Sequence, residues 1–315
     1  MTNSLAFLFP GQGSQSVGMG KELADKYAVA RQTFEEADAT LGMALSRLCF
    51  EGPEDELRRT EITQPSILTV SVATWRVLAA EGLQPAWLAG HSLGEYSAHV
   101  AAGTLTFADA VRTVRNRGRY MQEAVPAGVG AMAAILGMEA ERVRQVCAQS
   151  AQGAVCEPAN INSPEQIVVS GNKAAVERAL ALAMEQGAKK AVLLPVSAPF
   201  HCSLMKPAQD RLALDLHGLP LQNPATPVMC NVDAVPVTTA DLSRDALIRQ
   251  VTGAVRWDES VRNMIAKGVE TFVEVGPGKV LWGLMRQIDR AKTSWQTSDD
   301  SSLQKALQGL ATVAP

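Results

Sequence analysis

The clearest chemical signature in this sequence is a Gly-x-Ser-x-Gly pentapeptide at residues 90–94, centred on Ser92. The apolar residues 87–89 precede it and a segment of helical composition follows it. This order is typical of a nucleophile elbow, in which a strand turns sharply into a helix. Ser92 would then stand at a helix N-terminus, where free N–H groups stabilise negative charge. The pattern indicates a serine that attacks a carbonyl group, and the alternative is a serine in an ordinary strand-to-helix turn.

A serine nucleophile needs a general base, and the histidines are the first candidates. They are His91, His99, His201 and His217. His201 is expected on a loop between a strand and a helix that begins near Ser203, whereas His91 lies inside the elbow. The other two histidines fall in predicted helices. A loop histidine is commonly a surface residue, but the place of His201 at a junction between two predicted domains favours it as the base.

A predicted helix from about residue 107 to 124 carries an arginine in an unusual position. At about 100° per residue, Arg117 projects to the apolar face, which it shares with Met121. The other arginines of this helix share one solvated sector: Arg112, Arg115 and Arg119. Because a guanidinium stays charged at cellular pH, a buried Arg117 requires an anionic partner. Helix geometry leaves open whether a protein carboxylate or a ligand supplies it.

The composition limits the class of protein. The chain has 315 residues, enough for about two domains, with 47% hydrophobic and 19% charged residues, as in an ordinary globular protein. A formal net charge of −3 gives no reason to expect nucleic-acid binding. Neither a signal peptide nor an apolar run of roughly 20 residues is recognisable, so no membrane association is expected. The five cysteines are scattered, which favours reduced thiols in the cytoplasm over a zinc site or disulfides.

The elements that must position Ser92, His201 and Arg117 alternate between strands and helices, which predicts an α/β fold. A buried strand at 5–10 leads into a glycine-rich turn at 11–15. Residues 129–196 show a different pattern, strand–helix–strand–strand–helix–strand, which is the ferredoxin-like arrangement. This segment is long enough to form a small domain inserted into the larger one.

Several short motifs occur together along the chain. They are Gly11-Gln12-Gly13-Ser14-Gln15, Gly90-His91-Ser92-Leu93-Gly94-Glu95-Tyr96, Arg117 with Met121, Asn160 to Gly171, Phe200-His201 and Val275-Gly276-Pro277-Gly278. This combination resembles the malonyl-CoA:acyl carrier protein transacylases, and the resemblance runs from Phe7 to about Asp289. It implies a large α/β-hydrolase-like domain with a parallel sheet, residues 1–127 and 198–315. The ferredoxin-like subdomain, residues 128–197, would be inserted into it.

The resemblance also implies the catalytic roles. Ser92 would attack the thioester carbonyl of malonyl-CoA after His201 takes its proton. The backbone N–H groups of Gln12 and Leu93 would form the oxyanion hole. The backbone carbonyl of Gln250 would orient the histidine, in place of the carboxylate of a Ser-His-Asp triad.

Substrate binding is implied at four further positions. Arg117 would hold the free carboxylate of the malonyl group as a bidentate ion pair, which answers the question that helix geometry leaves open. Met121 and Asn162 would line the substrate site. Phe200 would crowd an α-methyl branch and so select malonyl over methylmalonyl groups.

By the same resemblance the protein would be a discrete transferase of fatty acid synthesis that works through a malonyl-serine, with ping-pong kinetics. Its partners would be malonyl-CoA and acyl carrier protein, whose phosphopantetheine thiol accepts the group. The chain itself would need no cofactor and no metal, and would act as a cytoplasmic monomer. The residues themselves leave open whether the product feeds fatty acids or a polyketide.

Two other classes of protein compete with this interpretation. A carboxylesterase or thioesterase could use the same Ser92 and His201, but such enzymes usually place an acid between the two and the histidine near the C-terminus. Here residues 202–315 follow the histidine, and Arg117 has no evident use in an ester hydrolase. A catalytically inactive binding module would require the loss of Ser92 or His201, and both are present.

Overall fold

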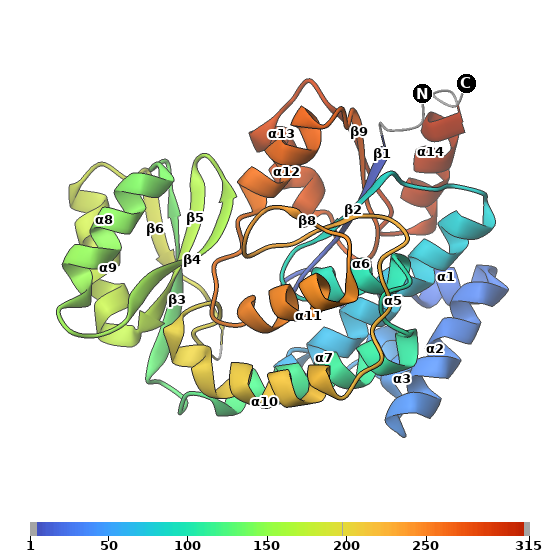
Figure 1. Ribbon diagram of the computed structural model, residues 1–315, viewed down its shortest axis with the longest axis horizontal. Helices are drawn as coiled ribbons and strands as arrows, with labels where there is room; N and C mark the ends of the chain where they lie inside the picture. The colour runs from blue at the N-terminus through green and yellow to red at the C-terminus, as the bar shows by residue number, and fades with distance from the viewer. Residues whose placement is uncertain (1–4, 197, 312–315) are drawn as a thin grey trace.

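The computed structural model describes residues 5–196 and 198–311. The described chain contains two β-sheets flanked by helices, which confirms the predicted α/β class (Figure 1). The larger sheet has the strand order β10-β9-β1-β2-β7-β8, in which β8 alone runs antiparallel to its neighbour. Its strands are β1 (Leu5–Phe9), β2 (Trp87–Gly90), β7 (Val228–Met229), β8 (Pro236–Val237), β9 (Thr271–Glu274) and β10 (Thr293–Gln296).

Helices cover both faces of this sheet. They are α1 (Lys21–Lys26), α2 (Ala28–Leu41), α3 (Leu45–Glu51), α4 (Glu54–Leu57), α5 (Thr60–Ala80), α6 (Gly94–Ala101), α7 (Phe107–Glu123), α10 (Lys206–His217), α11 (Ala240–Arg249), α12 (Trp257–Ala266), α13 (Val280–Ile288) and α14 (Asp300–Ala311), with a 3-10 turn at Ser203–Met205. None of the helices in the described ranges is long and apolar enough to cross a membrane.

Strand β1 shows why the sheet is buried on both faces. Its residues are all apolar, and successive side chains of a strand point to opposite faces. Ala6 and Leu8 pack in one hydrophobic cluster with α12 and α13, whereas Phe7 and Phe9 pack in another with α5 and α6. A strand with two apolar faces is therefore held between two helical layers, which fixes its place at the centre of the molecule.

The pairing of β1 with β2 brings two loops together. The strands are parallel, and Phe9 lies opposite Gly90, so both strands end at the same edge of the sheet. The loop after β1 and the turn after β2 touch there, because a Cβ on Gly11 would come within 2.4 Å of the carbonyl oxygen of His91. Glycine is thus required at position 11, and the glycine-rich loop lies against the elbow that contains Ser92.

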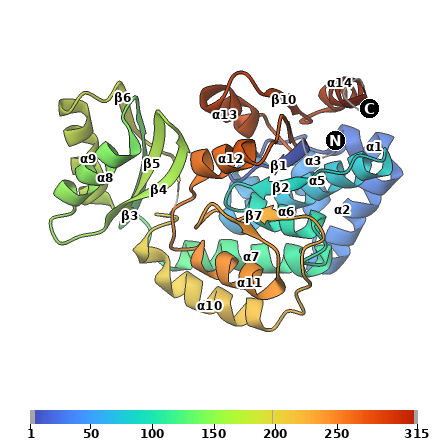
Figure 2. The same ribbon diagram turned by 45° about the horizontal axis from the view of Figure 1, so that its top comes forward.

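The second sheet forms a separate unit beside the first (Figures 1 and 2). Its strand order is β4-β5-β3-β6, and every pair is antiparallel. Its elements follow one another as β3 (Gly130–Leu136), α8 (Ala140–Ala151), β4 (Cys156–Ser163), β5 (Gln166–Asn172), α9 (Lys173–Glu185) and β6 (Lys190–Leu193). Helices α8 and α9 pack on one face of the sheet. Residue 197, at the predicted domain boundary, lies outside the described residues.

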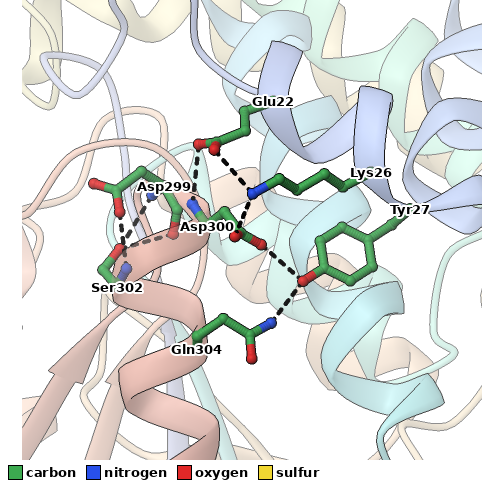
Figure 3. Close-up of polar contacts among 7 residues, drawn as sticks. All are labelled: Glu22, Lys26, Tyr27, Asp299, Asp300, Ser302 and Gln304. Atoms are coloured by element: carbon green, nitrogen blue, oxygen red, sulfur yellow. Dashed lines mark hydrogen bonds and ion pairs between the residues drawn. The ribbon is translucent and has the colours of Figure 1, made fainter.

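Helix α14 is fastened to the N-terminal helices by a polar cluster (Figure 3). Asp300 accepts hydrogen bonds from Lys26 at 2.6 Å and from the hydroxyl of Tyr27 at 2.8 Å. Gln304 donates to the same hydroxyl at 2.8 Å. Tyr27 has an extended backbone, which separates α1 from α2 and lets its ring reach α14. These contacts join segments that are far apart in the sequence.

Candidate active site

Ser92 lies at a sharp turn between β2 and α6, as the pentapeptide predicts. Its φ of 53° is in the left-handed region, which a side-chain-bearing residue occupies only when its surroundings enforce it. The flanking glycines allow this geometry, because a Cβ on Gly90 would come within 1.9 Å of the backbone of Gly94. A Cβ on Gly94 would lie 2.0 Å from the carbonyl oxygen of Phe9. The turn therefore tolerates no side chain on either side of the serine.

His201 lies within hydrogen-bonding distance of Ser92. Its Nε2 lies 2.7 Å from the Oγ of Ser92, and its Nδ1 lies 2.9 Å from the backbone carbonyl of Gln250 and 3.2 Å from that of Gly253. Two carbonyl oxygens can only accept, so they place the proton on Nδ1 and leave the lone pair of Nε2 toward the serine. Burial, together with the nearby charge of Arg117, lowers the pKa of His201 to about 3. The imidazole is therefore neutral and able to accept a proton.

Arg117 is almost completely buried, and its hydrogen-bond partners are neutral oxygens. Nη1 donates to Oε1 of Gln64 at 2.9 Å, and Nη2 donates to Oε1 of Gln250 at 2.8 Å. Nη2 also donates to Oγ of Ser92 at 3.2 Å, while Nε has no partner among the described residues. The ring of Tyr96 lies 5.6 Å from the guanidinium carbon. A buried cation with an unused N–H next to the serine is suited to bind an anionic ligand.

A cavity of about 370 Å³ opens above Ser92 and His201. The loop that contains Gln12 forms one wall, and the other wall is the face of the second sheet opposite α8 and α9. Phe200 lines the cavity directly before His201. The N-terminus of α6, which begins after Leu93, lies beneath Ser92. The geometry thus brings Ser92, Leu93, Gln12, Phe200 and His201 to one site.

Asn162 also lines this cavity, although it belongs to the second sheet. Backbone hydrogen bonds between the segment 159–161 and Val255 attach β4 to the larger unit at this point. The Oδ1 of Asn162 lies 2.8 Å from Nε2 of His91, whose ring also packs against Trp257. Burial lowers the pKa of His91, which favours the neutral ring. His91 therefore turns away from the serine and fixes the side-chain amide of Asn162.

Arg117 and Met121 lie behind the cavity wall and do not line it. The sulfur of Met121 is 3.8 Å from Nε2 of Gln64, the residue whose oxygen accepts from Arg117. Met121 thus contacts the support of the guanidinium. Nη2 of Arg117 contacts the Oγ of Ser92, and Ser92 lines the cavity.

Sequence reasoning missed Asn231, which holds the elbow in place, and the part that the side chain of Gln250 plays there. The side chain of Asn231, which follows β7, accepts from the N–H of Ser92 at 2.7 Å and donates to the carbonyl of Gly90 at 2.7 Å. Its own N–H donates to Glu95 at 3.0 Å. Gln250 donates to the same carboxylate and to the carbonyl of Ser92. Nothing in the local sequence around residue 231 signals this role, because it depends on the pairing of β2 with β7.

Residues 6–300 match the family model described as the acyl transferase domain, so the chain belongs to the acyl transferase family. A protein of Salmonella typhimurium named malonyl CoA-acyl carrier protein transacylase is 51% identical over 303 residues, which cover 96% of this chain and 98% of that protein. A Bacillus subtilis protein of the same name is 49% identical over 309 residues, 98% of each chain. Within the family, the chain is thus a member of the malonyl CoA-acyl carrier protein transacylases.

Solved structures agree with this assignment. An acyl carrier protein S-malonyltransferase from Vibrio cholerae superposes with a TM-score of 0.95 at 52% identity, over 96% of this chain and 100% of that chain. A malonyl-transacylase solved in complex with its type II PKS acyl-carrier protein gives a TM-score of 0.95 at 46% identity, over 98% and 100% of the two chains.

Proposed function

We propose that this chain transfers the malonyl group from malonyl-CoA to the phosphopantetheine thiol of acyl carrier protein, through a malonyl ester on Ser92. The observation that carries the proposal is the position of the Ser92 Oγ, 2.7 Å from Nε2 of His201 and 3.2 Å from Nη2 of Arg117. One atom thus lies next to a neutral base and next to a buried cation. The base His201 allows acyl transfer to and from the serine, and the cation Arg117 can bind an acyl group that has a free carboxylate.

The first half-reaction forms the ester. His201 takes the Oγ proton as Ser92 attacks the thioester carbonyl, and the carbonyl oxygen becomes negatively charged. The backbone N–H groups of Leu93 and Gln12 stabilise that oxygen, an effect worth about 3–4 kcal/mol per donor in related chemistry. The C–S bond then breaks, and His201 returns the proton to the leaving sulfur of CoA. In the second half-reaction the carrier protein thiol repeats these steps in reverse order, which gives ping-pong kinetics.

Arg117 selects the acyl group. A malonyl group on Ser92 carries its free carboxylate only a few bonds from the Oγ that Arg117 already contacts. The carboxylate would replace the serine contact and use the unpaired Nε–H in a bidentate pair. Phe200 crowds the carbon between the two carbonyl groups and so disfavours an α-methyl branch. Asn162, held by His91, offers its amide N–H groups to the substrate in the cavity.

We further propose that residues 1–127 and 198–315 form an α/β-hydrolase-like catalytic domain and that residues 128–197 form a ferredoxin-like insert. The element order from β3 to β6 and the antiparallel strand order β4-β5-β3-β6 support the second part of this proposal. The strand-to-helix turn at Ser92 in a largely parallel sheet supports the first. The protein would work in the cytoplasm as a monomer, without a cofactor or metal of its own, and supply malonyl groups for fatty acid synthesis.

A two-stage incubation tests this function. The protein is first mixed with malonyl-CoA alone, and free CoA and free malonate are both measured. A transferase releases CoA in an amount equal to the enzyme and then stops, whereas a hydrolase continues and releases malonate. Acyl carrier protein with its phosphopantetheine is then added, and malonyl-carrier protein should form. Continuous malonate release without transfer would contradict the proposal.

A further inference from the structure

Glu95, in the first turn of α6, is a completely buried carboxylate directly behind the elbow. Its Oε2 accepts from the backbone N–H of Asn231 at 3.0 Å and from Nε2 of Gln250 at 2.8 Å. Its Oε1 is buried and has no hydrogen-bond partner among the described residues. A buried carboxylate with half of its acceptor capacity unused is costly in free energy unless a nearby positive charge compensates it.

Arg117 is that positive charge, and Gln250 connects the two. The amide of Gln250 donates from Nε2 to Glu95 and accepts at Oε1 from Nη2 of Arg117, at 2.8 Å on each side. Within residues 5–196 and 198–311, the buried Asp, Glu, Lys and Arg side chains are Glu95, Arg117 and Glu274. Glu274 belongs to β9 and accepts from backbone N–H groups at the start of α13. The substrate-free site therefore holds one buried cation and one buried anion.

A malonyl group would upset this balance. Its carboxylate would pair with Arg117. The site would then hold two buried negative charges, those of the malonyl carboxylate and of Glu95, and the one positive charge of Arg117. A net buried charge of this kind is unfavourable in a low-dielectric interior. We propose that Glu95 is the internal counter-charge of Arg117 in the free enzyme and takes up one proton from solvent when a malonyl group occupies the site. This inference rests on the proposed function, because it requires the substrate carboxylate to bind at Arg117.

The environment of Glu95 favours such a change near neutral pH. Burial raises the pKa of Glu95 to about 7, although its hydrogen bonds with Gln250 and Asn231 and the charge of Arg117 oppose the rise. A second carboxylate beside Arg117 would cancel the effect of that cation and raise the pKa of Glu95 further. At a pH slightly above 7 the free enzyme would hold Glu95 mostly ionised, and the malonyl-enzyme would hold it protonated.

The other titratable groups around Glu95 do not change their ionisation state over this pH range. They are Arg117 of α7, Tyr96 of its own helix, Cys230 and Asp233 in the segment after β7, and His201, which contacts Gln250. Burial raises the pKa of Tyr96, and it raises that of Cys230 to about 11, so both stay neutral. The bond with Arg249 lowers the pKa of Asp233, which stays ionised, and His201 stays neutral. A proton taken up in this cluster is thus assigned to Glu95.

Acylation itself neither consumes nor releases a proton. The Oγ–C bond forms, the C–S bond breaks, and the Oγ proton passes through His201 to the sulfur of CoA. Any proton removed from the solvent during acylation therefore reports a change of ionisation elsewhere in the protein. A neutral acyl group, such as acetyl, brings no carboxylate and should leave Glu95 ionised.

The variant Glu95→Gln separates the charge of this residue from its hydrogen bonds. The amide oxygen can take the place of Oε2 and accept from both Asn231 and Gln250. The amide nitrogen then takes the place of Oε1, which has no partner to lose. The variant should preserve the positions of Gln250 and Arg117 while it removes the group that titrates.

The test measures proton uptake during one round of acylation. The enzyme is mixed with malonyl-CoA in weakly buffered solution with a pH indicator at about pH 7.5, roughly a unit below the pKa of about 8.5 of an ordinary thiol. Acyl-enzyme is quantified in parallel by mass spectrometry. With a pKa of about 7, Glu95 is roughly three-quarters ionised at this pH in the free enzyme. The wild-type protein should therefore take up roughly three-quarters of a proton per malonyl group and none per acetyl group, and Glu95→Gln should take up none.

A second readout is the pH dependence of KM. The KM for malonyl-CoA in the wild-type protein should rise with pH above 7, by up to about tenfold per pH unit. The reason is that binding is coupled to the uptake of one proton, and the proton concentration falls tenfold per unit. In Glu95→Gln that dependence should be flat. Malonyl-enzyme formation without proton uptake would overturn the inference and leave the proposed function intact, whereas a failure to form malonyl-enzyme would count against the proposed function itself.

Discussion

The Nδ1–H of His201 donates to the backbone carbonyl of Gln250 at 2.9 Å, where a Ser-His-Asp triad would have a carboxylate. A carbonyl oxygen fixes the tautomer and the orientation of the ring, but it brings no full negative charge to stabilise an imidazolium. Arg117 nearby disfavours the imidazolium further. We infer that His201 holds the serine proton only briefly and passes it on to the leaving sulfur. No side-chain substitution at position 250 removes this contact, because the acceptor belongs to the main chain.

The variant Arg117→Ala should lose malonyl transfer and gain acetyl transfer relative to it. Truncating one partner of a buried charge pair costs about 2–5 kcal/mol, or roughly 30-fold to several thousandfold in kcat/KM for malonyl-CoA. Rates with malonyl-CoA and acetyl-CoA are measured side by side. Arg112→Ala is the matched control, because Arg112 lies on the same helix with an exposed side chain. An unchanged malonyl preference in Arg117→Ala would exclude the carboxylate clamp.

Shortening Phe200 should admit a branched acyl group. Phe200 lines the cavity next to the base, and a pocket distinguishes one methyl group by about 10-fold to 200-fold. The ratio of methylmalonyl to malonyl transfer should therefore rise by about tenfold or more in Phe200→Ala. Leu284→Ala, which enlarges the same cavity from α13, serves as the control. If wild-type protein used both substrates equally, Phe200 would have no selective role.

Adding a methyl group beside the serine should unfold the elbow. In Gly94→Ala the new Cβ would stand 2.0 Å from the carbonyl oxygen of Phe9, in the central strand. The free energy of unfolding should fall by more than about 3 kcal/mol, which urea titration would detect. Gly283→Ala is the control, since no atom lies within 4 Å of its new Cβ and α13 should gain about 0.5–1 kcal/mol. Equal stability of the two variants would refute the close packing of the elbow.

Buried histidines should make the fold sensitive to acid. Burial lowers the pKa of His99 to about 3, against about 6.5 in an unfolded chain. The unfolded state therefore binds more protons between these values, and stability is lost as pH falls below about 6.5, at up to about 1.4 kcal/mol per unit for each such group. His99→Leu should flatten the slope of unfolding free energy against pH by one proton relative to the wild-type protein. An unchanged slope in His99→Leu would contradict this assignment.

Short-range patterns in the sequence were sufficient to predict part of this site. The pentapeptide, a strand and a helix are contiguous, so the turn at Ser92 follows from local composition. The helical period placed Arg117 on the buried face of α7, and the structure confirms its burial. Both predictions depend on residues within a few positions of each other.

Contacts between distant segments could not be predicted in this way. Asn231 lies 139 residues from Ser92, and its contact with the serine N–H depends on the parallel pairing of β2 with β7. Glu95 belongs to the elbow motif, but its role depends on Gln250, which lies 155 residues away. Tyr27, which separates α1 from α2, likewise has its hydroxyl held by Asp300 of α14, 273 residues away. Such contacts are set by topology, which periodicity does not reveal.

The most direct test of this account is mass spectrometry of the intact protein after incubation with malonyl-CoA, followed by peptide mapping. The account predicts one malonyl group per chain, located on Ser92, absent from Ser92→Ala and removed when acyl carrier protein with its phosphopantetheine is added. His201→Ala should form the adduct far more slowly than the wild-type protein. A chain that forms no adduct, or one that is malonylated at another residue, would contradict it.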